Sequence, residues 1–152
     1  MREQDAVARE GPLFAGDVSA GDTGPEVVVE DLTRQDFVRY AGASGDFNPI
    51  HYDEPFATGA GNPSVFGQGM LTAGFAATQV TDWFGLDRIE AFSTRFQSRV
   101  FPGDTVRATG EVVGIEEADD GSHVVEVDLV VTVADGEAVV TGSARARLPP
   151  RE

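Results

Sequence analysis

The amino-acid sequence predicts an α+β protein in which one long helix precedes an antiparallel sheet. The longest apolar stretch of the 152 residues runs from about 66 to 84, and its length and spacing favour a buried helix over a strand. Two later runs, 125–133 and 140–148, alternate apolar and polar residues as half-buried strands do. Asp120-Gly121 and Asp135-Gly136 are typical hairpin turns, and we expect them to join consecutive strands. This pattern supports the α+β class.

The N-terminal part is expected to form an arm followed by short elements. Residues 1–25 are rich in Gly, Asp and Ala and contain two prolines, which predicts an extended arm lying over a single domain at 26–150. The β-branched run 27–29 predicts a short strand. Thr33 is a favourable helix N-cap, and this helix is expected to end near Gly42. Its expected apolar stripe consists of Phe37, Val38, Tyr40 and Ala41.

Two further elements complete the prediction. A second short helix is expected at about 54–58, and a strand at about 89–100 should place Phe92 and Phe96 on one face. The glycines of the long helix each lower its helix propensity by about 1 kcal/mol relative to Ala, so close packing or a use of the exposed backbone must offset them. A helix wrapped tightly by a sheet would explain both the glycines and the apolar composition. The chain is too short for a second copy of this architecture, and it contains no internal repeat.

The stretch from Ser44 to His51, Ser-Gly-Asp-Phe-Asn-Pro-Ile-His, places a carboxylate and an imidazole five positions apart. Free Asp side chains ionise near pH ~4 and His side chains near pH ~6.5, so Asp46 and His51 could offer a proton acceptor and a proton donor to one shared water. Pro49 restricts its own φ and biases Asn48 away from helix, so the segment should hold a definite shape. This turn is the strongest candidate for acid–base catalysis.

This motif resembles the signature of the MaoC-like, (R)-specific enoyl-thioester hydratases. Three further segments share the resemblance: Gly67-Gln68-Gly69-Met70-Leu71-Thr72, Phe101-Pro102-Gly103-Asp104, and the run Leu32 to Gly42. Together they cover most of the chain. The last run is most similar to the catalytic subunit of the mycobacterial-type heterodimeric 3-hydroxyacyl-thioester dehydratases.

The resemblance implies a hot-dog fold, in which a curved antiparallel sheet wraps a central helix. It also implies reversible hydration of a trans-2-enoyl thioester of CoA or acyl-carrier protein to an (R)-3-hydroxyacyl thioester, without a cofactor. Asp46 and His51 would be the catalytic pair, and the backbone N–H of Gly69 would hold the thioester oxygen. Asn48 would brace the turn, and Gln68 stands where many relatives have His, which exchanges a titratable side chain for one that only forms hydrogen bonds.

Several alternatives stay open. A hot-dog thioesterase would act on the same class of substrate, and a non-catalytic acyl-thioester-binding subunit of a heterodimeric dehydratase would share the fold. The resemblance implies a dimer, either of two identical chains or with a related subunit. Gly69 could also be a glycine needed only for packing, and which member of the Asp46–His51 pair acts as base is not decided by the sequence. His123, beside a predicted turn, is expected at the surface.

Charge and composition exclude several classes of partner. Asp and Glu number 26 against 11 basic residues, all of them Arg, so the formal net charge is −15. Such a surface repels nucleic acid and anionic membranes. With no Cys and two His, neither a disulfide nor a metal site is expected. The charged N-terminus and the absence of any run of 18 apolar residues predict a cytoplasmic protein.

The acidic composition leaves two origins open, adaptation to a salty cytoplasm or GC-rich coding that favours Arg over Lys. It also makes any local group of arginines notable, because a CoA carrier would need cations to meet its phosphates. Arg88, Arg95 and Arg99 are candidates by their proximity in sequence, and solvated strand positions are the alternative for each.

Overall fold

The structure is a computed structural model that describes residues 11–152. The expected arm therefore lies partly outside the described residues, because positions 1–10 are not among them. The elements, in chain order, are β1 (Val27–Val29), α1 (Arg34–Ser44), the 3-10 turn η1 (Pro49–His51), α2 (Glu54–Gly59), α3 (Gly69–Phe84), the 3-10 turn η2 (Leu86–Arg88), β2 (Ile89–Phe96), β3 (Val106–Glu117), β4 (His123–Val133) and β5 (Ala138–Leu148).

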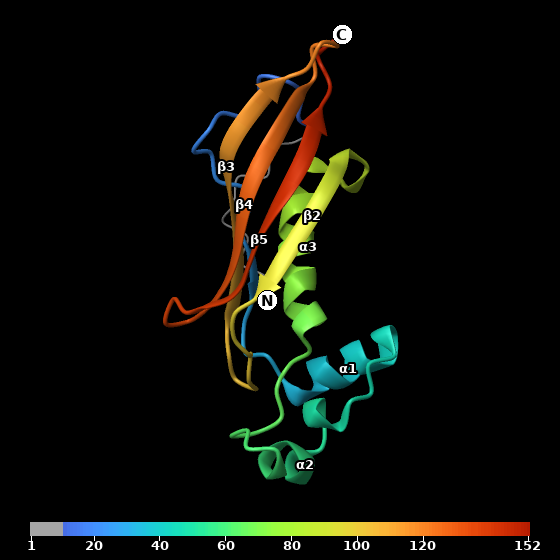
Figure 1. Cartoon of the computed structure of the whole chain (residues 1–152), viewed down its shortest axis with the longest axis vertical. Coiled ribbons are helices and arrows are strands. Elements are labelled where there is room, and N and C mark those ends of the chain that lie inside the picture. The colour runs from blue at the N-terminus through green and yellow to red at the C-terminus, as the bar shows by residue number, and fades with distance from the viewer. Residues whose placement is uncertain (1–10) are drawn as a thin grey trace.

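The strands form one antiparallel sheet in the order β1-β3-β4-β5-β2, and α3 packs along it (Figure 1). The β3–β4 and β4–β5 hairpins turn at the two predicted Asp-Gly pairs, where Gly121 and Gly136 adopt φ values of 78° and 85°. Only glycine adopts such values at little cost, which explains the residue choice. The α+β prediction is confirmed, and a helix held by a five-stranded antiparallel sheet is the hot-dog arrangement.

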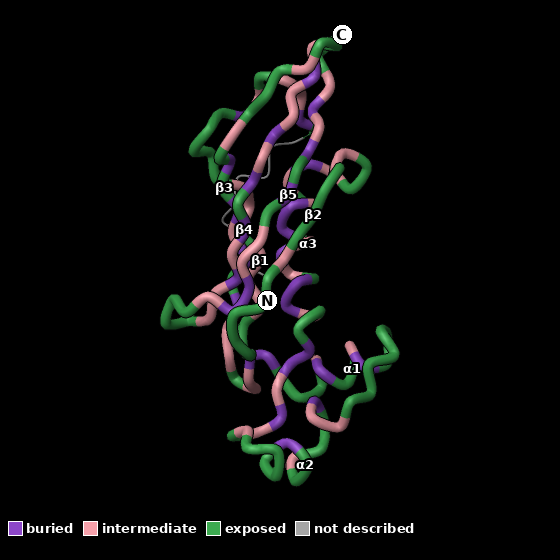
Figure 2. The backbone as a smooth tube through the Cα atoms, in the orientation of Figure 1, coloured by how far each residue is buried: buried purple, intermediate pink, exposed green. Residues whose placement is uncertain are grey.

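Small residues of α3 let the sheet approach the helix closely. Ala73, Ala76 and Val80 are each 1% exposed, and the inward-facing valines of the central strands bury against this side. Figure 2 shows the buried positions concentrated along α3 and the middle of the long strands. The buried helix therefore forms the centre of the core, as its apolar composition predicts.

Residues 11–25 run beside the sheet. Gly21 N–H donates to the Val112 carbonyl at 2.7 Å, and Gly24 N–H donates to the Gly110 carbonyl at 3.1 Å. A side chain on Gly24 would collide with the Trp83 ring, since its Cβ would lie 2.3 Å from two ring atoms. This segment thus continues the β1 edge along β3. Within residues 11–152, no helix is both long and apolar enough to cross a membrane.

Several predicted boundaries were wrong by a few residues. The long helix begins at Gly69 instead of about 66, because Gly67 N–H donates to the Val100 carbonyl and keeps that segment extended. The first helix continues to Ser44 and is ended by Gly45, at φ 78°. The strand expected at 89–100 ends at Phe96.

Two further expectations need correction. Val38, expected in the apolar stripe of α1, is 55% exposed. The buried residues of that helix are Phe37 and Ala41. The strand that the Asp120-Gly121 turn requires before it, β3, was not among the predicted ranges. A register shift between Val112 and Gly114 explains the omission, because a bulge breaks the two-residue alternation on which strand prediction depends.

Candidate active site

Helix α1 positions the Asp46 turn from one side. Thr33 and Asp36 form a capping box, in which Asp36 N–H donates to the Thr33 hydroxyl at 3.2 Å and Thr33 N–H donates to the Asp36 carboxylate at 2.8 Å. At the other end, Gly45 N–H donates to the Ala41 carbonyl at 2.9 Å. The helix is therefore fixed at both ends, and the chain leaves it in a defined direction.

A chain of local hydrogen bonds shapes the turn itself. Asp46 N–H donates to the Ser44 hydroxyl at 3.1 Å, and Asn48 N–H donates to the Asp46 carboxylate at 3.3 Å. The Asn48 side chain in turn accepts the Ile50 N–H at 3.1 Å and caps the 3-10 turn that Pro49 begins. Each bond spans two residues, so this geometry is encoded locally.

The geometry around His51 assigns its hydrogens. Its Nδ1 lies 2.7 Å from the Phe66 carbonyl oxygen. Because a carbonyl oxygen only accepts, Nδ1 must carry hydrogen, and Nε2 is left as the nitrogen that can gain or lose a proton. Nε2 faces the Asp46 carboxylate at 3.5 Å. The Phe66 ring also meets the imidazole edge-on, with 5.4 Å between centroids.

The two members of this pair differ in exposure. His51 is 7% exposed, whereas 45% of the Asp46 side chain is exposed. The imidazole is thus held in the protein, and the carboxylate stands at the surface beside it. Three aromatic residues of this turn and of the following helix α2 are exposed: Phe47, Tyr52 and Phe56.

Gln68 and Gly69 lie where α3 begins. Gln68 occupies the N-cap position, but its side chain makes no capping bond and instead donates from Nε2 to the Phe37 carbonyl at 2.9 Å. The first N–H groups of α3 lie at the positive end of the helix dipole, and of these the Leu71 N–H donates to the Gln68 carbonyl at 3.1 Å. Gln68 is 1% exposed, and its Oε1 has no hydrogen-bond partner among the described residues. The hydrogen bond from Gln68 to the Phe37 carbonyl therefore connects the start of α3 to α1.

Gly69 also packs closely against β2. A Cβ on Gly69 would lie 3.2 Å from two atoms of the Phe96 ring. The packing explanation for this glycine therefore has structural support, and it does not conflict with exposure of the N–H to a ligand. Gly69 lies three residues after Phe66, whose carbonyl holds His51.

Sequence reasoning did not identify the role of Phe66. The carbonyl of this residue determines which His51 nitrogen carries hydrogen. No sequence signal reports this contact, because every residue has a backbone carbonyl. His123 lies elsewhere and accepts the Gly16 N–H on Nδ1 at 3.3 Å.

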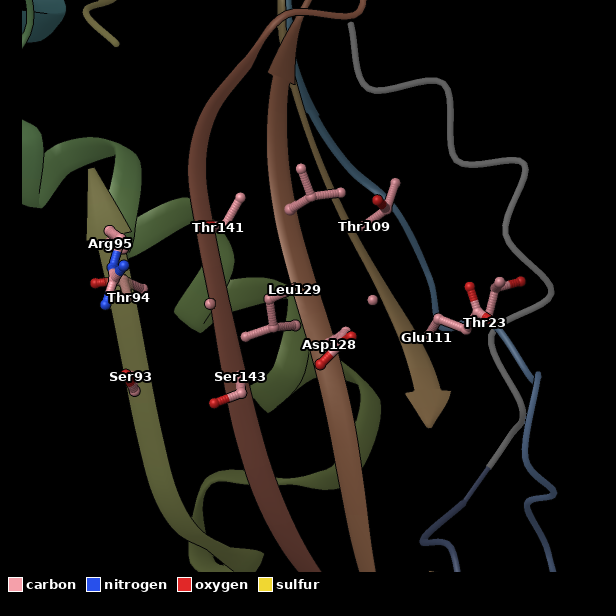
Figure 3. Close-up of a pocket in the computed structure, with 13 residues that line it drawn as sticks. Thr23, Ser93, Thr94, Arg95, Thr109, Glu111, Asp128, Leu129, Thr141 and Ser143 are labelled. Atoms are coloured by element: carbon pink, nitrogen blue, oxygen red, sulfur yellow. The ribbon is translucent and has the colours of Figure 1, made fainter. Parts of the chain in front are cut away.

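A separate groove of about 580 Å³ lies on the sheet. Figure 3 shows its lining side chains on neighbouring strands, with Arg95 on β2, Ser143 on β5 and Asp128 on β4. Neither Asp46 nor His51 lines it. Across residues 11–152, no three His, Asp or Glu side chains are grouped so that they could hold a metal ion.

Comparison with known proteins agrees with this architecture. Residues 18–135 match the family model described as a MaoC like domain. The chain is 32% identical over 126 residues to the (R)-specific enoyl-CoA hydratase of Rhodospirillum rubrum, a match that covers 82% of this chain and 85% of the relative. It is 35% identical over 86 residues to the mouse peroxisomal multifunctional enzyme type 2, covering 55% of this chain but only 12% of that longer protein.

Among solved structures, the (R)-hydratase from A. caviae involved in PHA biosynthesis superimposes with a TM-score of 0.76 at 25% identity, covering 89% of this chain and 100% of that one. The matched family segment spans most of the chain and includes α1, the Asp46–His51 turn and α3. On this evidence the chain belongs to the MaoC-like domain family.

Proposed function

We propose that this chain is a hydro-lyase that reversibly adds water to a trans-2-enoyl thioester, giving an (R)-3-hydroxyacyl thioester carried on CoA or acyl-carrier protein. The observation that carries this proposal is the pairing of His51 Nε2 with the Asp46 carboxylate at 3.5 Å while Nδ1 is engaged elsewhere. The family membership and the resemblance to named (R)-hydratases support the same reaction.

In this mechanism the Asp46–His51 pair holds one exchangeable proton. A water placed beside the gap between Nε2 and the carboxylate contacts both groups. As the water oxygen attacks C3, one group of the pair accepts a water proton and the other gives its proton to C2. The remaining O–H becomes the 3-hydroxyl. The proton taken from water then passes across the 3.5 Å gap to the group that protonated C2, which restores the pair for the next turnover.

Attack at C3 moves negative charge onto the thioester oxygen, so the reaction needs a hydrogen-bond donor already in place. The first N–H groups of α3, that of Gly69 foremost, are suited to this role because the helix dipole favours negative charge there. A donor of this kind contributes about 3 kcal/mol in other oxyanion holes.

The test is an assay of the purified chain with crotonyl-CoA. Loss of the enoyl absorbance, without release of free thiol, and formation of the (R)-3-hydroxy product would support hydration. Thiol release with no hydroxylated product would instead identify a thioesterase and overturn the proposal.

We also propose that two copies of this chain form a dimer. β2 is an edge strand, paired on one side with β5. Its Phe92 and Phe96 are 39% and 50% exposed, and the nearby Met70 of α3 is 61% exposed. An antiparallel contact between two β2 edges would pair free backbone groups and cover these side chains.

Light scattering of the pure chain tests the dimer. We expect twice the monomer mass, and a fully active monomer would contradict the proposal. An inactive chain that gains activity on adding a related hot-dog subunit would support the heterodimer. The non-catalytic binding subunit is less well supported, because the acid–base pair is intact.

A further inference from the structure

The ion pairs of this molecule separate its arginines into two groups. Within residues 11–152, five arginines each contact a carboxylate: Arg34 with Glu54, Arg107 with Glu26, Arg145 with Glu126, Arg147 with Glu90, and Arg151 with Asp17. Since the chain carries a net charge of −15, an arginine without such a partner needs another explanation. Four described arginines make no ion pair with another described residue: Arg39, Arg88, Arg95 and Arg99.

Three of these four have an evident explanation or lie away from the catalytic pair. Arg88 donates to the Leu13 carbonyl and lies over the Phe14 ring, so it fastens the N-terminal segment. Arg39 lies on α1 three positions after Asp36, where it adds to the lowering of the pKa of that carboxyl, which comes mainly from the N–H and the hydroxyl of Thr33. Arg95 lines the groove on the sheet, which contains neither Asp46 nor His51 (Figure 3).

Arg99 is the exception. Its guanidinium lies 4.9 Å from the centroid of the Phe66 ring, and the same ring meets the His51 imidazole at 5.4 Å. A single aromatic side chain therefore separates this exposed cation from the catalytic histidine. Contact with the ring face restricts the guanidinium while leaving its N–H donors available.

We infer that Arg99 binds an anionic group of the thioester substrate at the entrance to the Asp46–His51 site. This inference rests on the proposed hydratase function. The thioester and the double bond are uncharged, so the anion belongs either to the phosphates of the carrier or to a carboxylate on the acyl chain. A guanidinium suits both, because it donates two parallel hydrogen bonds to phosphate or carboxylate oxygens.

Three substrates separate the sources of negative charge. Crotonyl-N-acetylcysteamine carries none, crotonyl-CoA carries the carrier phosphates, and the N-acetylcysteamine monothioester of fumarate carries an acyl carboxylate. KM and kcat are measured for wild type, Arg99→Gln and Arg95→Gln at one low ionic strength. Arg95→Gln is the matched control, because it removes the same charge from an exposed arginine that lines the other groove.

We expect Arg99→Gln to raise KM about three- to fivefold for the substrate whose anion Arg99 binds, in line with loss of an exposed ion pair. The kcat values, the KM for the uncharged thioester and the unfolding temperature should stay unchanged, and Arg99→Lys should restore part of the affinity. Arg95→Gln should leave every KM at the wild-type value. Which anionic substrate responds identifies the source.

Two results would overturn the inference: unchanged KM for both anionic substrates, or an equal rise for the uncharged one. If wild type hydrated none of the three thioesters, the proposed function would fail separately. Calorimetric titration of CoA and of the fumarate thioester would then still decide the role of Arg99, since equal affinities in wild type and Arg99→Gln would exclude it.

Discussion

Phe66 leaves His51 with one nitrogen for proton transfer, and that nitrogen faces Asp46. We therefore expect Asp46→Asn and His51→Gln each to lower turnover by roughly 10² to 10⁴, the usual contribution of general acid–base groups. Asp46→Asn should change the unfolding temperature little, because that side chain is half exposed. Turnover with crotonyl-CoA and thermal unfolding are measured together.

His123→Gln is the control for this pair, because it alters the other histidine of the chain, whose one hydrogen bond within residues 11–152 is accepted from the Gly16 N–H. It should retain wild-type turnover. Near-normal activity in either Asp46→Asn or His51→Gln would show that the proposed pair is wrong.

The absence of a side chain at Gly69 can be tested by substitution. Gly69→Ala would place a methyl group 3.2 Å from the Phe96 ring, at the helix end proposed to hold the thioester oxygen. We expect kcat to fall at least tenfold with a small loss of stability, since the half-exposed ring can shift. Gly74→Ala is the control, because its Cβ would meet nothing within 4 Å in the same helix, and it should raise stability by up to about 1 kcal/mol.

The double variant Gly69→Ala/Phe96→Ala separates the two explanations for this glycine. If the methyl group blocks approach of the ligand, removing the ring leaves kcat low. Recovery of wild-type kcat in the double variant would show that Gly69 serves packing alone.

At the scale of elements, α1 carries the catalytic turn and depends on its capping box. The N–H of Thr33, and then its hydroxyl, hold the pKa of the Asp36 carboxyl below its usual value of 3.8. Because the pKa of Asp36 is lower in the folded than in the unfolded protein, its ionised carboxylate stabilises the folded state above pH 3.8. This stabilisation is lost as the pH falls through the folded-state pKa. Thr33→Ala should therefore cost about 1 kcal/mol of unfolding free energy at neutral pH, and less at strongly acidic pH.

Denaturant unfolding at several pH values measures this effect. Thr78→Ala is the control, because that hydroxyl donates to the Gly74 carbonyl in its own helix and to no other described residue, and its loss should be neutral or stabilising. If Thr33→Ala lowered the free energy of unfolding by the same amount at neutral and at strongly acidic pH, the role assigned to Asp36 would be contradicted.

The net charge of −15 is carried by a chain of 152 residues whose core consists mainly of buried apolar side chains. If the acidic surface is an adaptation to salt, the unfolding temperature should rise between 0.1 M and 1 M sodium chloride, as the Debye length falls from about 10 Å to about 3 Å. Sodium sulfate at matched ionic strength is the comparison, because it also strengthens apolar burial.

Charge screening predicts a gain in stability with both salts. A gain with sulfate alone would indicate apolar burial. Full stability in dilute buffer, with no response to sodium chloride, would favour GC-rich coding as the origin of the Lys-free composition.

Elements that depend on a few neighbouring residues are predictable from the sequence. The Asp-Gly hairpins, the Thr33 cap and the Asn48-Pro49 turn each rest on backbone preferences and hydrogen bonds within two or three positions. The long helix followed from its composition and length. The α+β class was therefore predictable, and so was the spacing of Asp46 and His51.

Contacts between groups far apart along the chain depend on the folded structure and could not be predicted in this way. His51 and the Phe66 carbonyl are 15 positions apart, and Gln68 and the Phe37 carbonyl are 31 apart. Because backbone carbonyls are the same at every residue, no pattern of side chains in the sequence predicts such contacts. Arg95 and Arg99 are equally charged and four positions apart in sequence, yet only Arg99 lies over the ring that packs against His51, because the chain leaves β2 between them.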